Sequence, residues 1–529
     1  MQNIEIDNKH YILLIILVIG IGIAARFVHI GAQTIYIDET WVVPTTNFHF
    51  EEKSIFPKLF TYPPYQQMST AKQELIKKIY NLHPLFQIAA LHAVSDNHPP
   101  LFFFANYYWS KYFGYNVTSI RIPAAIYSII TFFIILFILY KQKIPNNKKL
   151  IILSLVILSP IYLFYSNFAR PYTLLVLLSL LSSYLSYRLI ISDFNKKIIF
   201  YYIITASLCV FTHYYGVLVV ASQGIYMFIE SLIGNRKNII KVIAISFVLA
   251  LIFMPAGLII LYKHKLTSTN LSDFSYYYFD INALYDLFLS FGYAYSNSTK
   301  FSYLNIFVTV LQILLFLKGV LYLIKTRTDP ASRFWLLFFI IPFAIIFLLN
   351  TRIPLFTVRN CLILLIPYLA ICGFGLASIK KNIFSLSVST TIGLVGLSFL
   401  FYGLSYGNLN GEHAFENWKS TAEYIKSMKN DLPVYVFHQS YRDALYYYYP
   451  DEERIRNYPD DLRSEGPGDQ RFILVLMKHE NIPIEEKIAK SLPFMNKKNT
   501  FSVRLLNQSP HIYIYEIERT DSKSDSIET

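Results

Sequence analysis

The sequence predicts a polytopic α-helical membrane protein that carries a soluble α/β domain at its C-terminal end. Of its 529 residues, 54% are hydrophobic and 15% are charged, and the mean hydropathy is +0.39. A soluble chain of this length usually carries about 25% charged residues. Apolar runs such as Ile151–Pro160 and Thr173–Leu185 recur over residues 1–406. These features exclude disordered, fibrous and ordinary cytosolic proteins.

Charge is divided unevenly along the chain. Of the 47 Lys+Arg and 34 Asp+Glu residues, 16 and 20 fall in residues 407–529, which leaves 31 and 14 for residues 1–406. Basic loops that face a cytoplasm and anionic lipid explain most of this positive excess. The sequence shows no stripe of basic residues on a helix or strand that could contact bases, so nothing in it indicates nucleic-acid binding. The three cysteines lie in apolar segments, so we expect neither a disulfide framework nor a thiolate metal site (Cys209, Cys361 and Cys372).

The N-terminal apolar segment predicts a retained first span. Polar residues precede Tyr11, and no small-residue cleavage site follows Ile30. A removed signal peptide is the alternative interpretation.

Short basic connectors set the predicted topology, because cytoplasmic loops carry the Lys and Arg residues and a crossing needs about 20 apolar residues. Five such connectors are present: Lys141–Lys149, Lys196–Lys197, Arg236–Lys241, Lys325–Arg333 and Lys380–Lys381. The spans that follow are expected near 118–140, 149–168, 171–191, 198–212, 214–233, 239–261, 301–325, 333–350, 359–379 and 383–406. With the first span, this predicts about eleven transmembrane helices.

Pro99–Gly114 is predicted to be an interfacial or re-entrant helix at the outer face rather than a crossing. As a helix it is about 24 Å long, shorter than the roughly 30 Å hydrocarbon core. Its Tyr107, Tyr108, Trp109 and Lys111 are typical of a membrane interface. A crossing here would also place the basic Lys141–Lys149 loop outside.

The predicted domains are a transmembrane region, residues 1–406, and an extracytoplasmic α/β domain, residues 407–518. The first includes two outer loops, 31–117 and 262–300. The second has helical spacing and strand alternation; the expected helices are Asn417–Lys429 and Ile484–Leu492, and the expected strands are Pro433–Phe437, Phe472–Met477, Phe501–Leu506 and Ile512–Ile517. Residues 519–529 are expected to form a disordered tail.

The scarce carboxylates of residues 1–406 concentrate in the two outer loops, which hold nine of the 14: Asp38, Glu39, Glu51, Glu52, Glu74, Asp96, Asp273, Asp280 and Asp286. Asp38 and Glu39 stand directly after the first span, in IYIDETW. Adjacent carboxylates repel each other, which makes one of them a stronger base. A solvated helix start, with Asp38 as the N-cap, is the alternative.

Other candidate site residues occupy the predicted outer ends of spans. Asp96 and His98 precede the two prolines that enter the interfacial helix. Arg170 and Tyr172 lie at one outer hairpin, His213 lies at another, and Arg359 opens a span. Arginines that flank an outer acidic loop suit a phosphate, which guanidinium binds at two points. Snorkelling arginines, an interfacial histidine and a plain helix start are the alternatives.

An ordered set of sequence stretches resembles the type C (GT-C) membrane glycosyltransferases, specifically the protein O-mannosyltransferase and aminoarabinose-transferase-like group. The stretches are YIDET, DNHPPLFFF, GYNVTSIRIPAAIYS, SPIYLFYSNFARPYTLL, FTHYYG, TVRNCLILLIP and FENWKSTAEYI, and they cover roughly residues 11–430 in the family order. Most of these stretches match the family only loosely when each is taken alone, whereas their occurrence together in the family order is fairly specific.

The resemblance implies roles for particular residues and a lipid-linked donor. The family's catalytic aspartate falls on Asp38, with Glu39 beside it, and its HPP motif falls on His98. Its phosphate-handling arginines fall on Arg170 and, less securely, on Arg359. Several relatives carry a second acidic residue shortly after the hairpin that corresponds to Ala169–Leu174. In this sequence the stretch reads ARPYTLL and contains no carboxylate. We therefore assign no metal, although a divalent metal stays open as a cofactor.

The predicted function is transfer of a hexose or pentose from a polyprenyl-phosphate donor to an acceptor hydroxyl of a lipid, glycan or protein. The donor's phosphate is a good leaving group, so the enzyme needs a base and phosphate-holding cations. A single displacement would invert the anomeric centre. The expected location is the inner membrane of a bacterium, with the catalytic loops outside. A flippase for lipid-linked sugars and a polymer-binding scaffold are the alternatives.

Overall fold

The structure is a computed structural model. It describes residues 8–28, 30–31, 35, 39, 42, 98–267, 284, 287–288, 290–291, 302–350, 356–379, 393, 408–409, 412–413, 417–428, 430–436, 439–449, 454–457, 471–477, 500–508 and 512–520. The predicted span 383–406, apart from Gly393, and the predicted helix Ile484–Leu492 lie outside these residues. The chain divides into two compact units, Met1–Ile30 with Val42–Tyr402 and Gly31–Trp41 with Gly403–Thr529.

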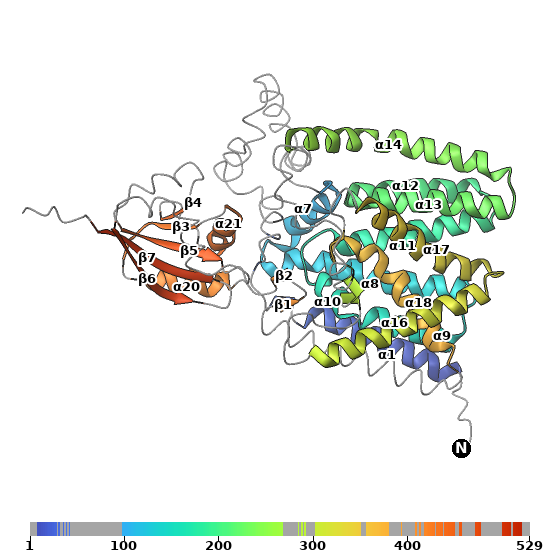
Figure 1. Cartoon of the computed structure of the whole chain (residues 1–529), viewed down its shortest axis with the longest axis horizontal. Helices are drawn as coiled ribbons and strands as arrows, with labels where there is room; N and C mark the ends of the chain where they lie inside the picture. The colour runs from blue at the N-terminus through green and yellow to red at the C-terminus, as the bar shows by residue number, and fades with distance from the viewer. Residues whose placement is uncertain are drawn as a thin grey trace, which may run out of the picture. The chain divides into compact units, whose positions relative to one another are not determined.

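All regular elements in the described residues of the first unit are helices (Figure 1). Its elements are α1 (Asn8–Phe27), α7 (Leu101–Phe113), α8 (Val117–Lys141), α9 (Asn146–Ile157), α10 (Pro160–Ser166), α11 (Tyr172–Ile191), α12 (Lys196–Thr212), α13 (Tyr215–Ile233), α14 (Asn238–Thr267), α16 (Ser302–Lys325), α17 (Pro330–Leu349), the 3₁₀ helix η4 (Asn360–Leu364) and α18 (Leu365–Ala377).

Seven helical segments of the described residues are long and apolar enough to cross a membrane, and there are eight if α9 and α10 count as one bent span. The chain is therefore a multi-pass membrane protein. Each predicted span from 118–140 to 359–379 coincides with a helix or helix pair. Helix α12 has 17 residues, about 26 Å at 1.5 Å per residue, and α14 is longer than the span predicted there.

The predicted single span 149–168 is instead two helices that meet at an angle of 57°. Pro160 is the first residue of α10, and it has no N–H group to continue the hydrogen-bond ladder of α9. Carbonyl groups at the end of α9 therefore need other partners. The buried guanidinium of Arg26 donates to the Ile157 carbonyl across 2.9 Å. Pro160 therefore breaks the span that was predicted to be one continuous helix.

Helix α7 occupies the segment that was predicted to be interfacial. It has 13 residues, about 20 Å, which is too short for a crossing. Phe102 and Phe103 are fully buried, whereas Tyr108 and Tyr112 on the other face are exposed. This two-sided character is typical of a helix at a surface, and its position in the membrane stays a prediction.

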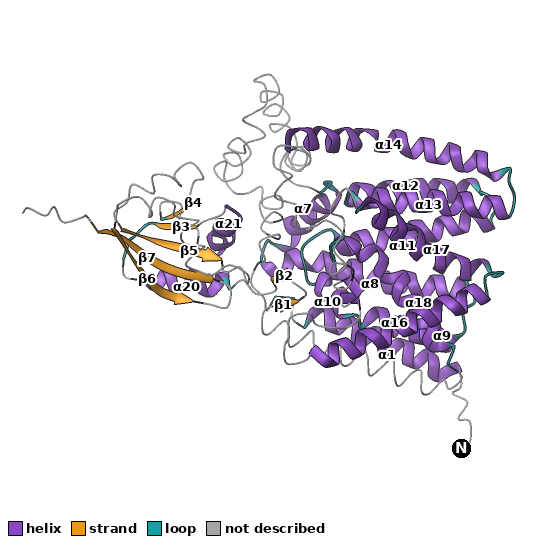
Figure 2. Cartoon of the chain, in the orientation of Figure 1, coloured by secondary structure: helices purple, strands orange, loops and turns teal. Residues whose placement is uncertain are grey.

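The second unit contains a five-stranded mixed sheet in the order β4-β3-β5-β7-β6 (Figure 2). Its strands are β3 (Val434–Val436), β4 (Ile455–Asn457), β5 (Arg471–Met477), β6 (Thr500–Gln508) and β7 (Ile512–Thr520), and its helices are α20 (Trp418–Ser427) and α21 (Gln439–Tyr448); β1 (Asn408–Leu409) and β2 (Glu412–His413) form a short hairpin. Strands β4, β3 and β5 are parallel, and α21 connects β3 to β4. The α/β prediction is confirmed.

The last strand extends beyond its predicted end. Thr520 of β7 pairs with Thr500 of β6, and Arg519 pairs with Phe501. Residues 519 and 520 therefore belong to the sheet rather than to the predicted tail, because β6 is long enough to provide partners for both.

Candidate functional site

Three connections meet at one end of the helical unit. His98 precedes α7, Arg170 lies between α10 and α11, Tyr172 is the first residue of α11, and His213 separates α12 from α13. Contacts between their side chains join these four residues into one group, which we call the His–Arg cluster. The structure therefore gathers four of the residues that were predicted for the site.

A tight turn positions Arg170. Helix α10 ends at Ser166, and the backbone N–H of Arg170 donates to the Phe168 carbonyl across 2.7 Å. Pro171 then provides the N-cap of α11 with a φ of −69°, close to the value that its ring imposes. The Arg170 side chain is 4% exposed. It is held within the bundle end rather than extended to solvent, as a snorkelling arginine would be.

Arg170 contacts His98 directly. Its Nη2 atom lies 3.0 Å from His98 Nδ1 and 3.4 Å from Nε2. A guanidinium is protonated at all accessible pH values and can only donate, so the nearer ring nitrogen, Nδ1, accepts. With Nδ1 assigned as the acceptor from this distance, the imidazole of His98 is neutral and its proton is on Nε2. The pair therefore presents N–H donors to its surroundings.

His213 has the same tautomer for a different reason. Its Nδ1 atom accepts a hydrogen bond from the backbone N–H of Tyr215 across 3.1 Å. The neutral ring therefore carries its proton on Nε2, where it can donate. The His213 ring is 4% exposed and lies 4.8 Å from the His98 ring, at 75° between planes.

Aromatic rings surround the cluster. Tyr172 is 1% exposed, and its ring lies 6.2 Å from His98 and 5.9 Å from His213. The Tyr165 ring lies 5.0 Å from the Tyr172 ring, and the Arg170 guanidinium lies 6.0 Å from the centre of the Phe103 ring. These rings lower the local dielectric constant, which strengthens the attraction between the cluster and an anion.

Arg359 is connected to the cluster through Tyr215. The Tyr215 hydroxyl interacts with the Asn360 side chain, and it interacts electrostatically with Arg359 and Tyr172. Arg359 and Asn360 are half-buried at the start of η4. Sequence reasoning did not select Tyr215, Asn360 or Phe103. Each of them is adjacent to a selected motif, in FTHYYG, TVRN and HPPLFFF respectively.

The acidic candidates are placed differently. Asp38 and Asp96 lie outside the described residues. Glu39 is described and fully buried, and it belongs to the second compact unit. The described ranges contain no group of three His, Cys, Asp or Glu side chains that could hold a metal ion. The roles of Asp38, Glu39 and Asp96 stay predictions.

The sequence matches no protein-family model and no curated protein. Solved structures do match the fold. ArnT from Cupriavidus metallidurans in the apo state aligns with a TM-score of 0.50 at 11% identity, over 95% of this chain and 97% of ArnT. ArnT bound to undecaprenyl phosphate aligns with a TM-score of 0.49 at 11% identity, over 96% of this chain and 98% of ArnT. An oligosaccharyltransferase from Archaeoglobus fulgidus aligns with a TM-score of 0.40 at 13% identity, over 66% of this chain and 53% of that protein.

The match to apo ArnT extends over almost the whole of both chains. At this identity the match concerns the fold. The chain has the fold of the type C membrane glycosyltransferases.

Proposed function

We propose that the chain is a glycosyltransferase that moves a sugar from a polyprenyl-phosphate donor to an acceptor hydroxyl. The transfer would occur at the outer face of a bacterial inner membrane. The observation that carries the proposal is the direct contact of Arg170 with His98, beside His213 and Tyr172, at one end of a GT-C fold.

The donors of the His–Arg cluster suit a phosphate. Arg170 is permanently cationic, and in the neutral tautomers derived above both His98 and His213 carry a proton on Nε2. The donor phosphate is a diester with two non-bridging oxygens, and a third oxygen is released as the bond to the sugar breaks. These oxygens accept several hydrogen bonds at once, and charge-assisted bonds of this kind are the strong ones. Arg359, near Tyr215, would add a second cation. The cluster therefore supports recognition of the donor phosphate.

The reaction would be one displacement at the anomeric carbon. The acceptor oxygen forms a bond to that carbon while the bond to the phosphate oxygen breaks, and polyprenyl phosphate departs with both electrons of that bond. A carboxylate takes the acceptor's proton; we assign this role to Asp38, with Glu39 as its neighbour. Negative charge grows on the phosphate as it leaves, and Arg170 would stabilise this charge in the transition state.

The fold supports a lipid-linked donor in a further way. ArnT, whose apo fold the chain shares, has also been solved with undecaprenyl phosphate bound. The helical unit offers lipid-facing surfaces for a prenyl tail, since many apolar side chains of α1, α14 and α16 are exposed. The proposal includes three classes of acceptor, which are a lipid, a glycan and a protein. It includes both hexoses and pentoses as the transferred sugar.

The test is a transfer assay with the full chain in liposomes. A panel of radiolabelled polyprenyl-phosphate sugars is supplied with total membrane extract as the acceptor source, and free polyprenyl phosphate is measured. We expect one donor to be consumed by wild type and not by Arg170→Ala. Consumption of none would contradict the proposal. Movement of an intact donor between leaflets would support the flippase alternative instead.

A further inference from the structure

The buried side chain of Arg26 joins four helices of the first unit. Arg26 lies in the last turn of α1 and is fully buried. Its Nε atom donates to Ser128 Oγ of α8 at 3.0 Å, and its Nη1 atom donates to the Gly22 carbonyl of α1 at 3.0 Å. The same Nη1 donates to the Ile157 carbonyl of α9 at 2.9 Å, and the centre of the Tyr162 ring of α10 lies 5.7 Å from the guanidinium.

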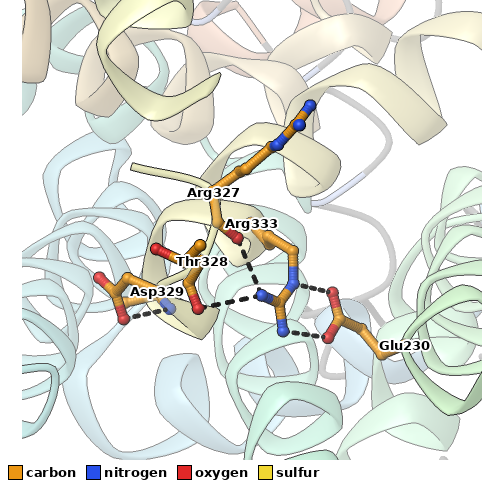
Figure 3. Close-up of polar contacts among 6 residues, drawn as sticks. Glu230, Arg327, Thr328, Asp329 and Arg333 are labelled. Carbon is orange, nitrogen blue, oxygen red and sulfur yellow. Dashed lines mark hydrogen bonds and ion pairs between the residues drawn. The ribbon is translucent and has the colours of Figure 1, made fainter. Parts of the chain in front are cut away.

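The charge of Arg26 has no carboxylate partner within the part of the chain that the structure describes, and its Nη2 atom has no hydrogen-bond partner there. Arg333, by contrast, donates to both carboxylate oxygens of Glu230, at 2.7 and 2.8 Å (Figure 3). A buried cation without a counter-ion is unfavourable, and inside a membrane bundle such a residue binds backbone carbonyls or serves a function. An apolar side chain would complete the first span at a lower cost. The partners of Arg26 therefore indicate what its charge does.

One of these partners is the carbonyl group that ends α9. In a continuous helix the Ile157 carbonyl would accept from the N–H group four residues later. The break before Pro160 turns α10 by 57°, and Arg26 Nη1 occupies this carbonyl instead. The C-terminal end of a helix carries a partial negative charge, which makes a cation favourable at this point. The guanidinium thus stabilises the broken form of the span relative to a straight one.

Helix α10 leads from this break to the turn that carries Arg170. It has seven residues and is about 10 Å long, so a tilt of about 10° at its base would shift its far end by about 2 Å. The rings of Tyr165 and Phe168 lie 5.0 and 6.3 Å from the Tyr172 ring of the His–Arg cluster. A misplacement of about 1 Å can lower a catalytic rate about 10²-fold. The direction of α10 therefore determines whether Arg170 meets His98.

The helix that carries Arg26 also leads to the proposed base. Ile30 follows the end of α1, and its carbonyl accepts a hydrogen bond from the buried guanidinium of Arg121 in α8 at 3.2 Å. Asp38 follows Ile30 by 8 positions in the sequence. Helix α8 thus holds the exit of α1, and Arg26 links this exit to α10.

We propose that Arg26 is a positioning residue for sugar transfer, an inference that rests on the proposed function. Its guanidinium holds α10, and with it Arg170 and the His–Arg cluster, in a fixed place relative to α1, and it does not contact the substrate. Two different nitrogens of the guanidinium bind three oxygens, one each from α1, α8 and α9. The single nitrogen of a lysine cannot reproduce this arrangement.

A double-mutant cycle tests this role, with donor consumption by the full chain in liposomes as the readout. Arg26→Gln removes the charge and should lower kcat/KM for the donor about tenfold, because Arg170 is displaced. In the Arg170→Lys background the same change should cost less than about twofold, since the contact that Arg26 protects is already lost. Arg26→Lys keeps the charge and should lose about three- to fivefold.

Hydrogen–deuterium exchange in lipid nanodiscs, read by mass spectrometry, gives a second readout that does not depend on activity. In Arg26→Gln we expect faster exchange that is confined to residues 158–172, the segment that α10 and its turn occupy. Ser154→Ala is the matched control. It removes a buried hydroxyl of α9 that donates to the Leu150 carbonyl, one turn before the break. This variant should change neither the exchange of residues 158–172 nor kcat/KM.

Three results would overturn the inference. One is an equally large loss from Arg26→Gln in both backgrounds, since the two arginines would then act independently. Another is exchange that rises in all helices alike, which would indicate general destabilisation. The third is wild-type kcat/KM in Arg26→Lys, because charge alone would then suffice. If wild type consumed no donor, the proposed function would be contradicted by that result, and the exchange pattern would decide separately whether Arg26 positions α10.

Discussion

The backbone N–H of Ile35 donates a hydrogen bond to the hydroxyl of Tyr448 across 2.8 Å, although 413 positions separate these residues. Ile35 is fully buried, and the Tyr448 carbonyl accepts from Lys426 at 3.0 Å. Both residues belong to the second compact unit, in which Gly31–Trp41 joins the C-terminal domain. The segment that carries Asp38 and Glu39 is thus attached to the α/β domain through α21.

Tyr448→Phe should therefore lower kcat about fivefold, the typical effect of losing one hydrogen bond, with little change in the KM for the donor. The reason is that the hydroxyl holds the segment before the proposed base and does not take part in donor binding. Tyr424→Phe is the matched control, because its hydroxyl donates to the Leu506 carbonyl within the same domain. Equal losses in both variants would indicate a general loss of domain stability instead.

Asp38→Asn tests the proposed acceptor base. Asparagine keeps the size of the side chain but cannot take a proton, so turnover should fall roughly 10²–10⁴-fold. Binding of the lipid donor, measured by isothermal titration calorimetry with a purified polyprenyl-phosphate sugar, should change far less. Near-normal turnover in this variant would transfer the role to Glu39 first and to Asp96 second.

Helix positions were well predicted from hydropathy, because apolar runs of membrane length leave few alternatives. The break between α9 and α10 was missed although Pro160 was visible. Pro123 and Pro342 lie inside continuous helices, so a proline alone does not decide between a kink and a break. In the α/β domain, β4 was missed because three strand residues show little periodicity, and α21 was missed because its tyrosines favour a strand by propensity.

The His–Arg cluster was only partly predictable. Motif order singled out His98, Arg170 and His213, but their mutual contacts depend on how α7, α11 and α13 pack. Tyr215 was missed because its role is set by a backbone contact to His213 and by proximity to Asn360.

Arg170→Lys separates phosphate binding from anchoring. Lysine keeps the charge but loses the planar donors, including the Nη2 contact to His98, so activity per folded molecule should fall clearly. Arg170→Ala should be worse, in both donor affinity and turnover, because the charge that stabilises the leaving phosphate is gone.

Arg188→Lys is the matched control for Arg170→Lys. It lies in the last turn of α11, the helix that follows Arg170, and donates to the Tyr184 hydroxyl at 3.3 Å, far from the cluster. Its activity should equal that of wild type. If Arg170→Lys is also fully active, Arg170 is an anchor and the phosphate role must pass to Arg359.

The Glu230–Arg333 pair should be the costliest ion pair to break among those described. The Glu230 side chain is 2% exposed and that of Arg333 is 23% exposed, so removing either partner leaves a poorly solvated charge. Single variants Glu230→Leu and Arg333→Leu should each lose about 3–5 kcal/mol of unfolding free energy, whereas the double variant should recover much of that loss.

The exposed pair of Lys241 and Asp193, 3.8 Å apart, is the control, with an expected loss of about 0–1 kcal/mol for Lys241→Ala. Denaturant unfolding in detergent micelles measures all four variants. If the losses of the two single variants simply add in the double variant, then the bidentate geometry contributes no coupling and the pair is held by the packing of α13 against α17 alone.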